Sequence, residues 1–187
     1  MIFAIIILAI IIILVIFGVV GFNKLRQADV AAQEALGGID VQLTRRADLV
    51  PNLVETVKGY AKHESGVFEA VTEARARVKK AASDGTVDEK AAAEASLDKS
   101  LVNVMAVAEQ YPDLKASTNF LALQEELSTT ENKVSFARQF YNDNVRSLNT
   151  AVKTIPTSFF AGMAKVGARP FYEVEDPQSR QVPTVKF

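Results

Sequence analysis

Ten charged or amide side chains recur at spacings typical of helix faces, and they are the main candidates for chemistry in this sequence. Five of them, between residues 124 and 149, are spaced 7, 7, 4 and 7, which places them along one side of a helix. The three arginines in the set could bind an anion or a small ligand. Charged and amide groups at such positions also fix the register of packed helices, and we favour this structural interpretation. The candidate polar network comprises Asp40, Arg45, Arg46, Asn52, Glu64, Gln124, Glu131, Arg138, Asn142 and Asn149.

The sequence holds little that could perform catalysis or hold a metal ion. General acid-base chemistry needs a poised pair of groups, but His63 and Glu64 are neighbours and would point about 100° apart on a helix. His63 is the only histidine and there is no cysteine, which excludes thiol catalysis, disulfides and histidine or cysteine metal clusters. We therefore expect no enzymatic activity, no catalytic residues, no cofactor and no metal site.

The charge balance argues against a nucleic-acid partner. The chain has 21 basic and 22 acidic residues, for a net charge of -1. Proteins that neutralise phosphate backbones carry a clear excess of lysine and arginine. We expect no nucleic acid among the partners.

Residues 2–22 contain no charged or polar side chain, and Gly18 and Gly21 are the only residues among them that are not apolar. About 20 such residues cross the roughly 30 Å hydrocarbon core of a bilayer as a helix, so the segment is predicted to be a single transmembrane anchor. A cleaved signal peptide is the alternative, but no basic residue precedes the apolar run. Because Lys24 and Arg26 follow the span, we predict that the rest of the chain faces the cytoplasm; the opposite orientation is the alternative.

Beyond the anchor, the hydrophobic pattern is helical. From Ile39 to Val78 a heptad pattern of mostly apolar positions steps by alternating 4 and 3, interrupted by the two charged residues Arg46 and Glu64. It predicts one helix from the membrane to about Lys80, with a bend at Pro51. A helix break at Pro51 is the alternative.

Local signals place three further helices. A capping box at 86–89 begins a helix that runs to about Gln110, and Ser117 or Thr118 can cap a third that ends at Pro156. Residues 157–165 suit a short amphipathic helix. We therefore predict an all-α protein: a transmembrane anchor (1–22) that continues into an antiparallel three- to four-helix bundle (23–165), followed by an extended, irregular C-terminal tail (166–187).

Helix lengths suggest a surface for self-association. A first helix over 23–80 would reach about 87 Å, and the second and third, at about 36 and 55 Å, would leave its membrane-proximal part uncovered. Because soluble domains rarely leave an apolar stripe exposed, we expect copies of the chain to bury it together. The candidate self-association residues are Leu25, Ala28, Ala32, Ala35 and Leu36.

Several motifs together resemble the LemA family. They include IDVQLTRRADLVPNLV at 39–54, YAKHE at 60–64, YPDLK at 111–115 and LQEEL at 123–127, and the likeness covers residues 23–187. Two places depart from the usual pattern of the family. Gly37-Gly38 stands where the family usually has a bulky aromatic residue followed by a small one, and Thr44 replaces a usual lysine. The resemblance implies a bacterial, single-pass membrane protein with a helical bundle and no established enzymatic activity.

These observations lead to one main functional hypothesis and two alternatives. The main one is a membrane-anchored scaffold or adaptor in the cell membrane that self-associates and presents its bundle to an unidentified membrane or cytoplasmic protein. A sensor or regulator that binds a small ligand or anion is the first alternative. The second is an accessory subunit of a membrane enzyme such as a quality-control protease.

Overall fold

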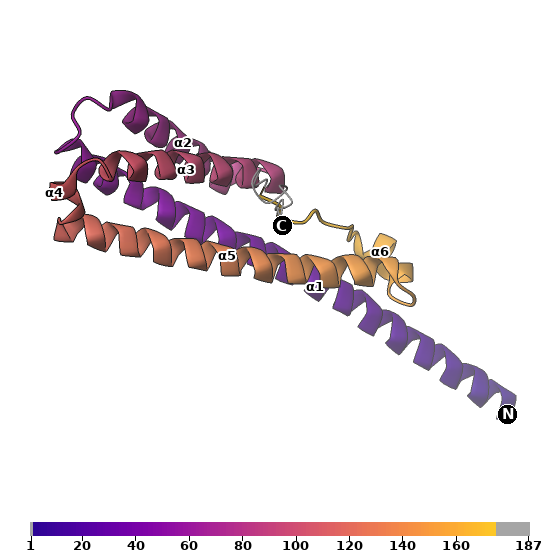
Figure 1. Ribbon diagram of the computed structural model, residues 1–187. Helices are drawn as coiled ribbons and strands as arrows, with labels where there is room; N and C mark the ends of the chain where they lie inside the picture. The colour runs from indigo at the N-terminus through magenta and orange to yellow at the C-terminus, as the bar shows by residue number, and fades with distance from the viewer. Residues whose placement is uncertain (1, 175–187) are drawn as a thin grey trace, which may run out of the picture. The chain divides into compact units, whose positions relative to one another are not determined.

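The computed structural model describes residues 2–174, and within them the chain is helical with no strand (Figure 1). This confirms the predicted all-α class. From residue 166 to residue 174 the backbone forms no regular element, and the rest of the predicted tail lies outside the described residues. The helices are α1 (Ile2–Lys58), α2 (Ser65–Asp84), α3 (Val87–Ala108), α4 (Pro112–Lys115), α5 (Thr118–Lys153) and α6 (Ser158–Ala164).

The predicted first helix is in fact two helices, which corrects the sequence interpretation. α1 passes through Pro51 without a break and ends at Lys58, and α2 begins only at Ser65. Gly59 follows the last residue of α1, and glycine is among the poorest helix formers. The heptad pattern continued across this turn because α1 and α2 each bury an apolar stripe, ending at Val57 in one and resuming at Phe68 in the other.

The other helices lie close to their predicted places. The capping box at Thr86 is present and begins α3, α5 begins at Thr118, and α6 falls inside the predicted 157–165 segment. Predicted core residues of α3, such as Leu97 and Val104, are fully buried. The interruption between α3 and α5 contains one further helical turn, α4.

The chain forms two compact units, which share α1 and α5 between them. One unit comprises residues 38–138 together with residues 172–174, and in it α2 and α3 lie side by side (Figure 1). Its core is built from one stripe of each helix. Fully or almost fully buried members include Ile39, Leu43, Leu53, Val71, Leu97 and Leu114.

The second unit comprises residues 2–37 and 139–171, and it overturns the premise for the predicted self-association stripe. Leu25, Ala32 and Ala35 are buried within the single chain, and Ala28 and Leu36 are partly buried. In the same unit Arg169 pairs with Asp29, at 2.8 Å. The comparison of predicted helix lengths was misleading because it left the membrane-proximal part of the first helix without any covering segment. In the structure, residues 139–171 form one compact unit with that part. This stripe is therefore not a free surface.

The N-terminal end of α1 has the properties of a membrane span. An 18-residue window within α1 has a mean hydropathy of 3.6, and none of that window is buried. A core helix of a soluble protein would be mostly buried, so this explanation does not fit. The described residues thus contain one helix that is long and apolar enough to cross a membrane. A signal sequence near the N-terminus can match this length and composition, and it is the alternative interpretation of this segment.

Candidate functional site

A buried group of charged side chains lies in the unit of residues 38–138, and α3 supplies its centre. The capping box sets where α3 begins: the Thr86 hydroxyl accepts from the Glu89 backbone N–H at 3.3 Å, and the Thr86 N–H donates to Glu89 Oε2 at 2.7 Å. Lys90, Glu94 and Asp98 follow at intervals of four residues, which places them on one face of α3. Helix geometry thus aligns three ionisable groups toward the neighbouring helices.

Glu94 is the most enclosed of these groups, with no solvent exposure. Its Oε2 accepts a 2.7 Å hydrogen bond from the Tyr172 hydroxyl, and its Oε1 lies 3.2 Å from Arg138 Nη1 on α5. Burial raises the pKa of Glu94, while the Tyr172 hydrogen bond and the Arg138 charge act in the opposite direction. Burial, and then the nearby Glu94 charge, likewise raise the pKa of the Tyr172 phenol.

Arg46 of α1 connects α3 to α5. Its guanidinium pairs with Asp98 on α3 and, at 2.5 Å, with Glu131 Oε2 on α5, and the residue is only 7% exposed. Glu131 Oε1 lies 3.6 Å from Arg138 Nη2. Tyr172, Glu94, Arg138, Glu131, Arg46 and Asp98 therefore form one continuous set of contacts, which we call the charged network.

The charged network contains more acid than base. Three carboxyl groups face two guanidiniums, so the set carries a net charge of -1 when every member is ionised. Burial raises the pKa of Asp98 as it does that of Glu94, with Arg46 opposing. Uptake of one proton would balance the set. Among the described residues, no group of three or more His, Cys, Asp or Glu side chains is arranged to hold a metal ion.

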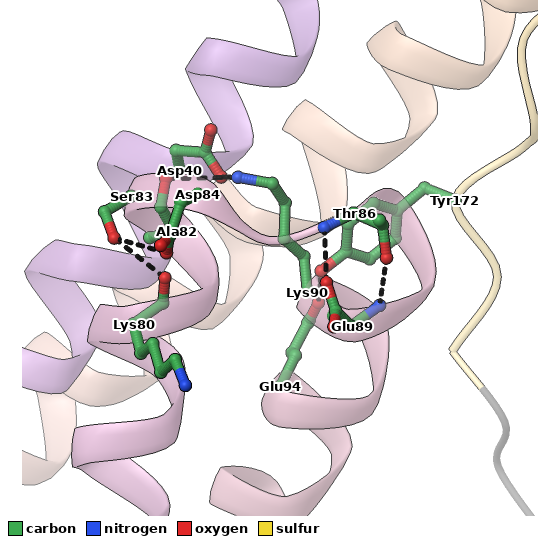
Figure 2. Close-up of polar contacts among 10 residues, drawn as sticks. All are labelled: Asp40, Lys80, Ala82, Ser83, Asp84, Thr86, Glu89, Lys90, Glu94 and Tyr172. Atoms are coloured by element: carbon green, nitrogen blue, oxygen red, sulfur yellow. Dashed lines mark hydrogen bonds and ion pairs between the residues drawn. The ribbon is translucent and has the colours of Figure 1, made fainter.

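A separate ion pair joins α1 to the first turn of α3 (Figure 2). Lys90 Nζ lies 2.5 Å from Asp40 Oδ1, and it also donates to the Ala82 carbonyl at 3.1 Å. Burial raises the pKa of Asp40, against the effect of Lys90. The pair stabilises the end of α2 next to the start of α3.

The structure brings together only some of the ten predicted polar residues. Arg46, Glu131 and Arg138 belong to the charged network, and Asp40 pairs with Lys90 beside it. Arg45, although adjacent to Arg46, turns to the surface, where it pairs with Glu126 at 2.9 Å. The sequence neighbours diverge because successive helical residues point about 100° apart.

The remaining candidates lie elsewhere. Asn52 and Gln124 are exposed, and Glu64 lies half-buried just before α2. Asn142 and Asn149 belong to the other unit, where the Asn149 amide exchanges hydrogen bonds of 2.9 and 2.8 Å with the Arg169 backbone. The predicted stripe on α5 is therefore divided between two units, and it is not one site.

Sequence reasoning missed Lys90, Glu94, Asp98 and Tyr172. The first three were detectable, since polar residues at intervals of four flank the apolar positions Leu97 and Leu101 of a predicted helix. Tyr172 gave no such signal, because it lies in a segment without periodicity.

A groove between α3 and α5 opens next to the charged network. Its volume is about 610 Å³, and Arg46, Asp98 and Glu131 line it together with apolar residues. Glu109 adds a third carboxylate, so one positive charge faces three negative ones. The apolar lining residues are Leu101, Val102, Met105, Ala106 and Leu127.

Comparison with known families supports the resemblance seen in the sequence motifs. Residues 35–187 match the model of the LemA family. A search of curated proteins finds no match to the chain.

Proposed function

The chain belongs to the LemA family, and from this premise we propose that it is a membrane-anchored helical adaptor that presents its distal unit to another protein. The observation that carries the proposal is the continuity of α1. One uninterrupted helix is exposed and apolar over its first turns, and it buries Ile39, Leu43 and Val57 in the core of the unit of residues 38–138. An anchor built this way transmits its attachment directly to a folded domain.

The groove between α3 and α5 supports the adaptor role. Apolar walls such as Val102 and Met105 suit the side chains of a polypeptide segment, and the excess of carboxylates favours a basic one. Val102 is 66% exposed although it is a large apolar residue. We propose that the partner is a protein segment with apolar side chains and at least one lysine or arginine.

Two other functions fit the geometry less well. An anion sensor needs free arginines, but Arg45, Arg46 and Arg138 are each paired with at least one carboxylate. An enzyme needs an unengaged acid-base pair beside a pocket, whereas the ionisable groups lining the groove from α1 and α5 are paired with each other. We therefore propose a non-enzymatic role without a cofactor. An accessory subunit of a membrane enzyme is one form that an adaptor can take.

Self-association stays a prediction, and it needs a surface other than the stripe of Leu25, Ala32 and Ala35. The lipid-facing sides of the anchor are such a surface. Size measurement of the full-length protein in mild detergent over a wide concentration range tests it. A single monomeric species at every concentration would remove self-association from the proposal.

The cytoplasmic placement of residues 23–187 is proposed from Lys24 and Arg26, which follow the span. A reporter that is active only outside the cytoplasm, fused after Phe187, should be silent. Strong activity of that fusion would reverse the orientation.

The adaptor proposal is tested by affinity capture from detergent-solubilised membranes. Val102→Lys places a positive charge in the groove and should abolish capture of a basic partner, whereas Val41→Lys changes a similarly exposed valine of α1 that does not line the groove. We expect a defined protein to be recovered with the wild type and with Val41→Lys but not with Val102→Lys. Equal recovery by all three would contradict docking in the groove, and extraction of the protein from membranes by alkaline carbonate would contradict the anchor.

A further inference from the structure

The region around α6 exposes three large apolar side chains at intervals of four residues. Ile155, Phe159 and Met163 are 75%, 72% and 66% exposed, respectively. Ala164 and Val166, by contrast, are buried. α6 therefore has one side that packs on its own unit and another, with Phe159 and Met163, that presents apolar surface covered by nothing in the described residues. Ile155 adds exposed apolar surface from the turn before the helix.

The packed side is seated on the candidate membrane span. The rings of Phe160 and Phe17 meet edge to face, with centroids 6.0 Å apart. Phe160 also lies over Gly21 so closely that a Cβ there would be 2.5 Å from Phe160 Cδ2. A side chain at position 21 would therefore force the Phe160 ring to move away. α6 is held against the last turns of the apolar segment by these contacts.

The position of Phe17 gives the depth of this contact. Phe17 lies five residues before Phe22, the last residue of the apolar segment, which corresponds to about 7.5 Å along a helix axis. Helices that lie in a membrane interface bury their apolar face by about 5–10 Å into the boundary between headgroups and acyl chains. α6 is therefore at the level where such helices lie.

The charges around α6 suit the same location. Residues 144–172 contain no aspartate or glutamate. Lys153 and Lys165 flank the turn and α6, and both are exposed. Lysines in such positions extend their ammonium groups to lipid headgroups while their alkyl chains stay in apolar surroundings.

We propose that residues 155–163 form a second membrane contact, in which Ile155, Phe159 and Met163 insert into the interface of the bilayer that holds α1. This inference rests on the membrane anchoring proposed above. The occupant of the exposed apolar side is lipid, because the opposite side already contacts the membrane span through Phe160 and Phe17. The second contact restricts rotation of the unit of residues 2–37 and 139–171, which includes the anchor, about the membrane normal.

The absence of cysteine allows a direct test with single thiols. An environment-sensitive fluorophore is attached to the single cysteine of the full-length variants Phe159→Cys and Met163→Cys. Each labelled protein is then reconstituted into phosphatidylcholine–phosphatidylglycerol vesicles with or without brominated acyl chains. Val19→Cys reports on the anchor, and Val102→Cys reports on a valine as exposed as Met163 but in the other unit. We expect brominated lipid to quench the label at positions 159, 163 and 19 and to leave the label at 102 unchanged.

The outcomes separate this inference from the anchor itself. Quenching at position 19 without quenching at 159 and 163 would overturn the second contact and leave the anchor standing. No quenching at position 19 would contradict the anchor, and the inference with it. A blue shift at 159 without quenching by brominated lipid would show that protein covers the side chain, which also overturns the proposal.

Discussion

The hydroxyl of Tyr172 donates a 2.7 Å hydrogen bond to Glu94 Oε2, although 78 positions separate the two residues. Both are buried, and Glu94 has no solvent exposure. The contact attaches the start of the C-terminal segment to the middle of α3. A buried carboxylate without such a donor would lose a compensating hydrogen bond and keep the full penalty of desolvation.

Replacing Tyr172 with phenylalanine tests this contact, because the ring stays and only the donor is lost. We expect Tyr172→Phe to lower the free energy of unfolding by about 1.5–3 kcal/mol, the usual range for a hydrogen bond to a charged group. Urea unfolding of the full-length protein in detergent measures it. Tyr60→Phe, which changes a half-exposed tyrosine, is the matched control and should leave stability unaltered.

Arg138 should matter far more to stability than Arg45. Arg138→Ala leaves buried Glu94 without its cation, and loss of one partner of a buried ion pair destabilises proteins by about 3–5 kcal/mol. Arg45 and Glu126 are 50% and 45% exposed, so Arg45→Ala is expected to change stability by less than about 1 kcal/mol. Equal effects of the two substitutions in urea unfolding would mean that the charged network has no special role in stability.

The charged network should also give an unusual pH dependence. Because burial raises the pKa of Glu94, the folded protein retains a proton at a pH where the unfolded chain, with an ordinary value of 4.5, has lost it. The contribution of Glu94 to stability is then greatest below pH 4.5 and declines as pH rises from there through the folded pKa. Asp98 and Asp40, whose pKa values are also raised, act with the same sign.

Glu94→Gln should therefore make the free energy of unfolding fall less steeply with rising pH. Glu89 provides a control of opposite sign, since the hydrogen bond from the Thr86 backbone lowers its pKa. Its stabilising contribution is present at neutral pH and is lost as pH falls, so Glu89→Gln should shift the slope the other way. Urea unfolding over a series of pH values measures both. Identical slopes for wild type and Glu94→Gln would refute the assignment.

Charges placed at Ala32 and Ala35 should disrupt the fold rather than an oligomer. Both alanines are buried within the single chain, so Ala32→Glu with Ala35→Glu forces two carboxylates into a packed interior. We expect loss of helical circular dichroism at lower temperature than in the wild type, with no dependence on protein concentration. Ala31→Glu with Glu34→Ala keeps the net charge and alters less buried positions of α1, and it serves as the control. Unchanged thermal stability of the double glutamate variant would contradict the burial.

Much of the secondary structure was predictable because its causes are local. The capping box at Thr86 needs only Glu89 three residues later, and the apolar faces of α3 and α5 follow from a period of 3.6 residues. The exposed apolar segment of α1 was predictable for the same reason, since its length and composition suffice. Family membership followed from contiguous motifs and was confirmed over residues 35–187.

The end of α1 and the cover of its membrane-proximal stripe were decided by tertiary packing. A heptad pattern indicates which residues are buried, but it does not indicate which segment covers them. The same pattern is therefore expected whether the helix continues past Gly59 or ends there. It likewise could not show that Leu25 and Ala32 are buried in one unit with residues 139–171.

The partners of the buried charges were also decided only in three dimensions. The sequence by itself determined that Arg46, Glu131 and Arg138 lie on helix faces next to apolar residues, and it determined the spacing of Lys90, Glu94 and Asp98. Whether Arg46 or its neighbour Arg45 faces the core depends on the rotation of α1 relative to α3 and α5, which packing of all three helices sets. Tyr172 reaches Glu94 only because the chain returns to α3 after α6, a long-range path that no local pattern encodes.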